Sequence, residues 1–383
     1  MARALMNYFK DNREVMIDFL KKLVTFETPS RDKASQDKIF DFLEMKFKEL
    51  EFYTIRVKGN QTGGYLYARP KFKKKNEPVQ LLIGHCDTVW ALNTLRELPI
   101  TAQNGKTTGP GIYDMKAGLT QIYFALKATR SMSLDLPALP TILINSDEEI
   151  GSVESTATIK RLSKIANRAY VMEPPLGLDG KLKTARKGIG RFIITVKGKA
   201  AHAGLDPKKG VNAIVELSHQ VQQLYAMNNF DKGITVNVGL IEGGQSANVV
   251  AAGSRAVIDV RVLNKKDGEY ITKKIHSLEP MLDEVELFIE GGIGRPPMER
   301  TARNQKLWRL AQEKARSIGL NLEQACAGGG SDGNTTSLYT ATLDGLGTVG
   351  DGAHATHEFI FTETLLERTA LLTLLLAEDV LKN

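Results

Sequence analysis

Cysteine is scarce in this sequence: Cys86 and Cys326 are the only two among 383 residues. Two cysteines cannot build a disulfide framework or a cage of thiolate ligands, and both lie in apolar or glycine-rich surroundings. A metal site in this chain would therefore have to use nitrogen and oxygen ligands.

Long apolar runs are also absent. No stretch of the sequence approaches the roughly 20 apolar residues that a membrane-spanning helix needs. Residues 1–11 show neither the apolar core nor the small-residue cleavage site of a secretory signal. With 42% hydrophobic and 25% charged residues, the composition is that of an ordinary soluble protein. We therefore expect a cytoplasmic protein without a membrane partner.

Nucleic-acid-binding motifs are missing as well, although the formal net charge is +7. The densest basic run, at residues 71–75, is short and comes directly before Asn76, Glu77 and Pro78. This context is typical of a solvated turn rather than of a polyanion-binding surface. We expect no nucleic-acid partner.

The length of 383 residues predicts about two domains, because a single hydrophobic core usually stops growing near 250–300 residues. Apolar residues at helical spacing predict helices over 4–25 and 34–50. Strands and helices then alternate between residues 52 and 173, which predicts an α/β domain with a mostly parallel, helix-covered sheet. Helical patterns return at 303–318 and 361–381.

The middle of the chain has a different order of elements. Between residues 190 and 290 the pattern is strand, helix, strand, strand, helix, strand, the order of a ferredoxin-like α+β unit. Residues 291–297 are rich in glycine and proline, which is typical of a junction between domains. We expect one domain built from residues 1–187 and 295–383, with a second domain inserted at 188–294.

An apolar run at residues 81–84 ends abruptly in His85, Cys86 and Asp87. On an extended strand, His85 and Asp87 point to the same face. A carboxylate beside an imidazole can accept one ring N–H and leave the other nitrogen free to bind a metal. A histidine and an aspartate two positions apart are equally typical of a strand end on the protein surface. His85 and Asp87 therefore predict a metal site only if other candidate ligands are found at the ends of other strands.

Four further stretches place acidic or imidazole groups just beyond apolar runs or turns. They carry Asp114, then Asp147 with Glu148 and Glu149, then Glu173, and finally His354 with His357. The carboxyl ends of strands border the ligand crevice of an open α/β sheet, so these groups would converge there. Clustered carboxylates cost several kcal/mol unless a cation compensates them. Singly, the acidic run could be a solvated turn and Glu173 a strand cap, but together they favour a site for Zn²⁺, Co²⁺ or Mn²⁺.

These segments resemble the M20 family of di-zinc metallopeptidases, in particular its glutamate carboxypeptidase branch. The matching stretches are residues 84–89, 109–118, 147–152, 173–174, 198–204 and 328–333. They run through nearly the whole chain in the order that the family has. The resemblance implies a zinc-peptidase-type catalytic domain, with an inserted ferredoxin-like domain that mediates dimerisation.

The resemblance further implies two Zn²⁺ ions per chain, with Co²⁺ or Mn²⁺ as alternatives. His85 and Glu173 would hold one ion. Glu149 and a C-terminal histidine would hold the other, and Asp114 would bridge the two. In the family this histidine lies four residues before a glutamate that is followed by an aromatic and an aliphatic residue. That pattern points to His354, although His357 is also available.

The remaining site roles also follow from the resemblance. Glu148 would be the general base, and Asp87 would be the partner of His85. The inserted domain would form a homodimer and lend His202 to an active site, that of the partner subunit. The substrate-contacting positions would be Asn248, Arg261 and Arg295.

We expect metal-assisted hydrolysis of an amide bond in a small peptide, releasing a C-terminal, glutamate-like amino acid. Guanidinium groups can bind a substrate carboxylate through paired hydrogen bonds, which favours an acidic end. An N-acyl amino acid deacylase of the desuccinylase kind is an alternative, because the same chemistry cuts acyl amides. A non-catalytic metal-binding scaffold is a further alternative, against which the presence of Glu148, His202 and a complete ligand set argues.

Overall fold

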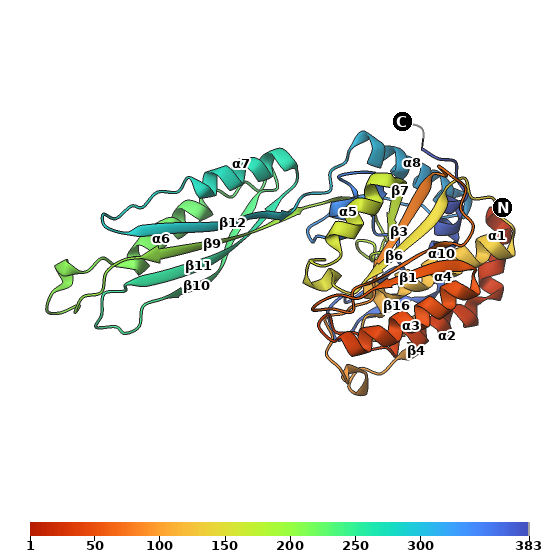
Figure 1. Ribbon diagram of the computed structural model, residues 1–383, viewed down its shortest axis with the longest axis horizontal. Coiled ribbons are helices and arrows are strands. Elements are labelled where there is room, and N and C mark those ends of the chain that lie inside the picture. The colour runs from red at the N-terminus through yellow and green to blue at the C-terminus, as the bar shows by residue number, and fades with distance from the viewer. Residues whose placement is uncertain (382–383) are drawn as a thin grey trace. The chain divides into compact units, whose positions relative to one another are not determined.

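The computed structural model describes residues 1–381, which form two compact units (Figure 1). The first unit contains Met1–Thr184, Arg300–Cys326 and the described residues from Ser331 onward. The second contains Ala185–Glu299 and Ala327–Gly330. The exact boundaries of the inserted domain, 188–294, and its role in the active site remain predictions. Among the described residues, no helix combines the length and the apolar character needed to cross a membrane.

A six-stranded sheet forms the centre of the first unit. In spatial order its strands are β1 (Phe52–Val57), β2 (Tyr65–Pro70), β6 (Leu139–Asn145), β3 (Val79–His85), β7 (Ala166–Val171) and β14 (Ala341–Leu343). The pairs β3–β6, β3–β7 and β7–β14 are parallel, whereas β1–β2 and β2–β6 are antiparallel. The expected mostly parallel α/β sheet is thereby confirmed.

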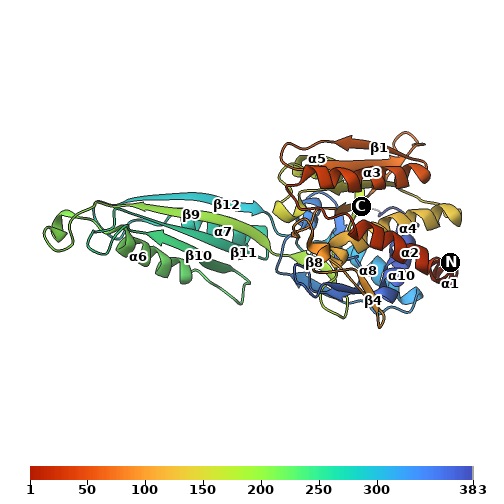
Figure 2. The same ribbon diagram turned by 90° about the horizontal axis from the view of Figure 1, so that it is seen from below.

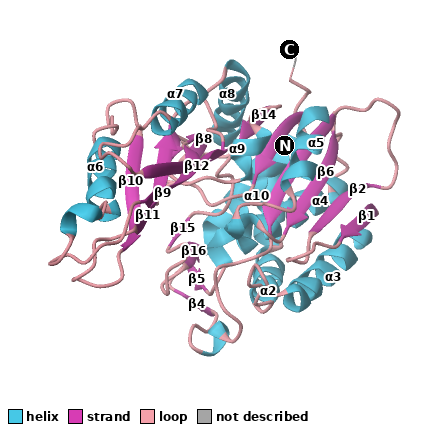
Figure 3. Ribbon diagram, turned by 60° about the vertical axis from the view of Figure 1, so that its left-hand side comes forward, coloured by secondary structure: helices cyan, strands magenta, loops and turns pink. Residues whose placement is uncertain are grey.

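Helices cover both faces of this sheet (Figure 3). One face packs against α1 (Ala2–Asp11), α2 (Arg13–Val24), α3 (Lys33–Glu49), α4 (Ala117–Ser131), α8 (Ala302–Ser317) and α10 (Thr362–Leu376). The other face packs against α5 (Thr156–Ile165), and the short α9 (Asp332–Thr336) lies beside α5. Within β3, Leu82 joins the first core while Leu81 and Ile83 join the second, because strand side chains alternate between faces.

The second unit is a four-stranded antiparallel sheet with two helices on one face (Figure 2). Its elements in chain order are β9 (Gly188–Lys197), α6 (Ala213–Tyr225), β10 (Thr235–Gly243), β11 (Gly253–Val262), α7 (Lys265–His276) and β12 (Glu286–Arg295). Alternate residues of β9, such as Phe192 and Ile194, share one core with Leu217 of α6 and Ile271 of α7. The expected ferredoxin-like order of strands and helices is confirmed.

Two smaller sheets are also present among the described residues. The strands β15 (Gly350–Asp351), β16 (Phe359–Phe361), β5 (Lys106–Thr108) and β4 (Thr101–Gln103) form one of them, and β8 (Leu182–Arg186) pairs with β13 (Gln324–Ala327). The pairing of β16 with β5 brings the chain around His354 next to the segment that leads to Asp114. Sequence patterns did not predict these strands, which have two to five residues each.

Three predicted element boundaries were wrong. The helix predicted over 4–25 is interrupted at Asn12, whose side-chain amide donates to the carbonyl oxygen of Tyr8 at 2.8 Å and competes with the backbone. The helix predicted over 361–381 ends at Leu376. The strand predicted to end at residue 290 continues to Arg295, because residues 291–295 pair with β9. The two strands lie so close there that a Cβ on Gly291 would collide with the carbonyl of Arg191.

Candidate metal centre

Five segments of the first unit carry acidic or imidazole side chains to one edge of the sheet. His85 is the last residue of β3, and Glu173 follows the end of β7 by two residues. Glu149 lies in a short 3-10 helix after β6, and Asp114 lies just before α4. His354 lies in the loop between β15 and β16. The carboxyl ends of parallel strands border the binding crevice of such sheets, as the sequence predicts.

Asp114 lies between two imidazoles. Its Oδ1 is 3.2 Å from Nε2 of His85, and its Oδ2 is 3.5 Å from Nε2 of His354. Each imidazole also faces a second carboxylate: His85 Nε2 is 3.5 Å from Oε1 of Glu173, and His354 Nε2 is 3.1 Å from Oε2 of Glu149. One carboxylate is therefore shared by two separate histidine–glutamate pairs, and these five residues are called the ligand cluster below.

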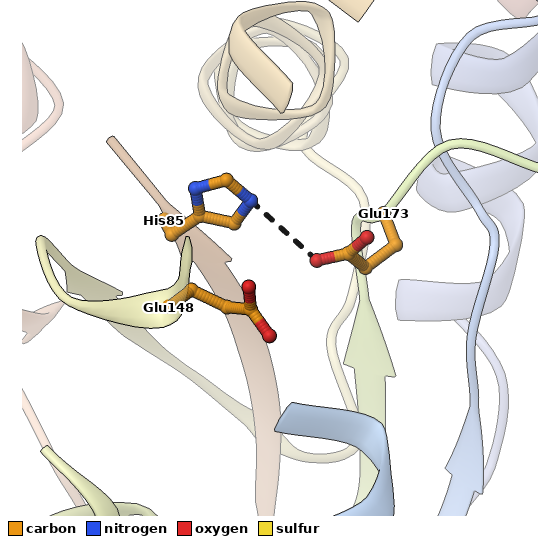
Figure 4. A group of neighbouring side chains, drawn as sticks. All are labelled: His85, Glu148 and Glu173. Carbon is orange, nitrogen blue, oxygen red and sulfur yellow. Dashed lines mark ion pairs between the residues drawn. The ribbon is translucent and has the colours of Figure 1, made fainter. Parts of the chain in front are cut away.

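Glu148 points toward the same place as His85 and Glu173 (Figure 4). One potential ligand atom from each of these three residues lies within 4.8 Å of the others, and the same holds for His85, Asp114 and Glu149. Because Glu148 and Glu149 are consecutive residues of one 3-10 turn, their side chains diverge, and each joins a different group.

Asp87 connects the strand of His85 with the segment of Glu148 and Glu149. The Nδ1 atom of His85 is 3.0 Å from the backbone oxygen of Asp87 and 3.4 Å from its Oδ1. The carboxylate of Asp87 is fully buried and accepts the N–H groups of Glu148 and Glu149, both at 3.2 Å, and the hydroxyl of Ser30 at 2.8 Å. Asp87 is thus a partner of His85 that also orients the neighbouring acidic segment.

The imidazoles and carboxylates shift one another's pKa. Hydrogen bonds from the His354 ring to the carboxylates of Asp114 and Glu149 raise the pKa of His354 to about 10. Burial opposes a charge on His85, yet Asp114 and the neighbouring carboxylates raise the pKa of His85 well above its ordinary range. Burial also opposes ionisation of Asp114, but both imidazoles hold its pKa well below the ordinary value. A divalent cation bound by the same atoms would replace the protons on the two imidazoles and would balance the negative charge of the carboxylates. The set of donor atoms therefore fits a metal ion.

A buried polar network supports the acidic segment from behind. Asp147 accepts the hydroxyl of Ser155 at 2.6 Å, and Asn145 donates to that hydroxyl at 3.0 Å and to Asp332 at 2.7 Å. Ser152 donates to the other carboxylate oxygen of Asp332 at 2.5 Å. The sequence predicted no role for Asp332, although it belongs to the glycine-rich stretch at 328–333 that carried the resemblance.

The two C-terminal histidines lie in different surroundings. His354 adopts a left-handed backbone conformation, with φ at 63°, and its ring faces Asp114 and Glu149. His357 is exposed and lines a separate cavity of about 180 Å³ together with Trp90 and Leu98. The geometry therefore places His354 and not His357 in the ligand cluster.

Comparison with known proteins identifies the family. The chain is 30% identical over 352 residues to carboxypeptidase G2 of Pseudomonas sp. (strain RS-16), an alignment that covers 90% of this chain and 84% of that protein. The chain belongs to the M20 family of metallopeptidases. The YXEP protein of Bacillus subtilis, which is 15% identical to this chain with a TM-score of 0.70 and coverage of 96% and 98% of the two chains, is described as a dinuclear metal-binding peptidase of the M20 family. The relatives indicate a hydrolytic enzyme, as the sequence predicts.

Other M20 proteins differ in what they act on. The chain is 29% identical over 225 residues to the succinyl-diaminopimelate desuccinylase of Aliarcobacter butzleri, covering 56% of this chain and 57% of that protein. The aminopeptidase PepT of Bacillus cereus has the same fold, with a TM-score of 0.80, 21% identity, and coverage of 96% and 98% of the two chains. Residues 184–278 match the family described as the peptidase dimerisation domain. The M20 assignment thus covers peptidases and deacylases.

The four remaining predicted site residues of this M20 protein lie in the second unit, in two groups. The backbones of His202 and Asn248 lie together, because Ala203 donates to the carbonyl of Asn248 at 3.0 Å. The Nδ1 atom of His202 accepts the N–H groups of Gly204 and Leu205, both at 3.1 Å. In the neutral ring the proton is then on Nε2, which makes Nε2 a hydrogen-bond donor.

Arg261 and Arg295 form the other group, beside residues 328–330. Arg261 donates to the carbonyl of Gly328 at 3.4 Å and to both oxygens of Asp259, at 2.7 and 3.0 Å. Arg295 packs against the backbone of Gly330, since a Cβ on this glycine would lie 2.9 Å from Cδ of Arg295.

The two groups lie at opposite ends of the sheet. Arg261 pairs with Ile189 near the start of β9, whereas His202 follows the far end of β9, where Lys197 pairs with Gly253. Eight residues of antiparallel strand separate Gly253 from Arg261, which amounts to roughly 27 Å. A small substrate therefore cannot contact both groups of one second unit.

Proposed function

We propose that this chain is a two-metal amide hydrolase that uses the ligand cluster. His85 and Glu173 would hold one ion. Glu149 and His354 would hold the other, and Asp114 would serve both. The observation that carries this proposal is that the two oxygens of Asp114 face two different imidazoles. Imidazole and carboxylate donors suit Zn²⁺, with Co²⁺ and Mn²⁺ as alternatives.

The proposed reaction is the attack of water on an amide carbonyl. Bound metal ions would supply Lewis-acid polarisation of the carbonyl and a lower pKa for water. The carboxylate of Glu148 would take the proton of the attacking water and return it to the leaving nitrogen as the C–N bond breaks. The position of Glu148 next to His85 and Glu173 supports this role.

His202 would stabilise the negative charge that develops on the carbonyl oxygen. Its Nδ1 is occupied as an acceptor by two backbone N–H groups, so its Nε2–H is available as a donor. We propose that it acts on the site of a partner subunit. The separation of His202 from Arg261 and Arg295 supports this arrangement, since one small substrate would need residues from two chains to meet all three.

A homodimer through the second unit would provide that arrangement. The match to the peptidase dimerisation domain supports it. Strand β10 stands at the edge of its sheet and exposes Leu240 and Ile241, which are 60% and 59% accessible. An exposed apolar edge strand is a ready template for pairing with a second chain.

The proposed substrate is a small peptide with a C-terminal, glutamate-like residue. The similarity to carboxypeptidase G2 supports it, and so do two arginines on one part of the second unit. Arg261 is already paired with Asp259, so a substrate carboxylate would have to share or displace that pair. Asn248 lies next to the loop of His202 and would therefore contact the substrate bound by the partner subunit, together with His202.

An N-acyl amino acid deacylase is the second candidate. The similarity to a succinyl-diaminopimelate desuccinylase favours it, and the proposed roles of Glu148 and the ligand cluster do not depend on the leaving group. The two candidates differ only in which side of the amide bond the protein recognises.

A substrate panel with Zn²⁺ tests both candidates. The full-length chain is stripped with a chelator, reloaded with Zn²⁺, and assayed on peptides with C-terminal glutamate, on matched peptides with C-terminal lysine, and on N-succinyl and N-acetyl amino acids. We expect metal-dependent cleavage, with the glutamate peptides having the highest kcat/KM. Preference for acyl amino acids would select the deacylase, and no metal-dependent turnover of any member would contradict the proposed function.

A further inference from the structure

Glu358 is a buried residue that the reaction described above does not use. Its side chain is 3% accessible and lies between His354 and β16. Its Oε2 accepts the N–H of Gly111 at 2.8 Å and the indole N–H of Trp90 at 3.0 Å. Its Oε1 accepts the N–H groups of Tyr113 at 2.9 Å and Asp114 at 3.0 Å.

These four donors occupy the whole acceptor capacity of the carboxylate. An ionised glutamate offers about four lone-pair positions, and each oxygen of Glu358 here accepts two N–H groups. No position remains for a metal ion or for the proton of a water molecule. Glu358 is therefore arranged to hold a segment of chain and not to take part in proton transfer.

The segment that Glu358 holds leads into an irregular π-type turn at Ile112–Lys116, inside which Asp114 and Met115 depart from helical backbone angles. The N–H groups of Gly111, Tyr113 and Asp114 precede α4, which begins at Ala117, and they donate to Glu358. The N–H of Ile112 donates instead to the carbonyl of Gly109 at 3.2 Å. Gly111 has φ at 70°, a turn that glycine adopts without strain. The carboxylate of Glu358 takes the place of a helix or a sheet as the acceptor for this turn.

Glu358 also belongs to the chain segment that carries His354. Its own N–H donates to the carbonyl of Ala355 at 3.0 Å, and its carbonyl accepts the N–H of Gly109 at 3.3 Å. One residue thus connects the loop of His354 to the turn of Asp114 through both its backbone and its side chain.

We propose that Glu358 is a positioning residue that fixes Asp114 between His85 and His354. This inference rests on the proposed function of the ligand cluster. Groups that orient metal ligands typically change metal affinity or activity by about 10- to 100-fold when they are removed. We expect a loss of that size when the carboxylate of Glu358 is replaced.

The test uses Glu358→Gln in the full-length chain, with Glu363→Gln as the matched control. Glutamine keeps the shape, but one of its two terminal atoms is an NH₂ group that would face two N–H donors. Glu363 is an exposed glutamate on α10 that pairs with Arg13 on the surface. Both variants and the wild type are measured with and without Zn²⁺.

Two measurements are made. Hydrogen exchange of peptides that cover residues 109–116, read by mass spectrometry in the metal-free chain, reports whether the turn is held. Competition with a chelator gives the Zn²⁺ dissociation constants. We expect Glu358→Gln to speed exchange in these peptides and to weaken Zn²⁺ binding by about 10- to 100-fold, whereas Glu363→Gln matches the wild type in both.

Unchanged exchange, or faster exchange with unchanged Zn²⁺ affinity, would overturn the positioning role. A wild-type chain that binds no Zn²⁺ would instead overturn the proposed function, and exchange alone would then show whether Glu358 holds the turn. If Glu358→Gln does not fold, Trp90→Phe decides, because it removes one donor and keeps the glutamate. We expect this variant to exchange faster and to bind Zn²⁺ about 2- to 10-fold more weakly, and wild-type values in both measurements would overturn the proposal.

Discussion

Glu148 and Glu149 are adjacent in sequence, yet they belong to different groups of side chains. Glu149 faces His354 at 3.1 Å, whereas Glu148 groups with His85 and Glu173. We predict that Glu148→Gln keeps the bound metal but lowers kcat/KM by about 10²- to 10⁴-fold, because an amide cannot accept the proton of water. Steady-state kinetics, with metal content determined on the same samples, measure the effect.

The exposed Glu363→Gln variant serves as the control for Glu148→Gln and should retain wild-type kinetics. A decrease of less than about tenfold for Glu148→Gln would contradict the assignment of the general base. Loss of metal from this variant would instead make Glu148 a ligand.

His354 and His357 are three positions apart, but only the ring of His354 faces Asp114 and Glu149. We predict that His354→Ala loses one of the two metal ions, because it removes an imidazole that faces Asp114 and Glu149. His357→Ala should retain about two ions per chain, since His357 lines a separate cavity. Elemental analysis of the purified variants measures the difference, and the reverse pattern would transfer the ligand role to His357.

At the scale of elements, Glu154 ties the turn before β2 to the segment that leads into α5. Its carboxylate accepts the N–H groups of Asn60, Gln61 and Thr62, and also the hydroxyl of Thr62. We predict that Glu154→Gln lowers the free energy of unfolding by about 1–2 kcal/mol at neutral pH, because it removes charge-assisted hydrogen bonds. Urea denaturation curves measure this difference.

The effect of Glu154→Gln should depend on pH. Burial opposes ionisation of Glu154, but the hydrogen bonds from Thr62 and from the backbone lower its folded-state pKa below the ordinary 4.5. The stabilisation is therefore complete above about pH 4.5 and is lost as the pH falls through the folded-state pKa. Glu97→Gln, an exposed control, should show no such trend. A difference between wild type and Glu154→Gln that persists undiminished at low pH would contradict this account.

At the scale of the whole molecule, the separation of His202 from Arg261 along one sheet supports a site shared between two chains. We predict that His202→Ala and Glu148→Gln chains, each nearly inactive alone, regain activity when their subunits are exchanged. In a mixed dimer, one site would lack both groups and the other would be complete. Random exchange of equal amounts should restore about a quarter of the wild-type activity.

Two observations are needed to interpret that mixture. Differently tagged chains purified together show that the mixed dimer has formed, and each variant mixed with itself gives the background. A mixed dimer that forms and stays inactive would mean that His202 acts within its own chain or not at all. His202→Ala should keep its metal, because its imidazole is not part of the ligand cluster.

Much of the fold follows from local patterns. The apolar run of β3 and the helical spacing of α3 predicted both elements to within a residue or two, because burial imposes a period on the side chains. The break at Asn12 and the strand at Gly291 were missed. In each case the outcome depends on a particular contact, with Tyr8 or with the paired strand, that composition does not reveal.

The types and order of the candidate ligands were also accessible from the sequence, because each follows a strand or a turn where a sheet presents side chains to its crevice. Only the tertiary structure decided that Asp114 faces two imidazoles and that His354, rather than His357, is one of them. The same holds for Glu358, whose partner Tyr113 is 245 positions away. Local periodicity reports which residues are buried, whereas such contacts depend on how distant segments pack against one another.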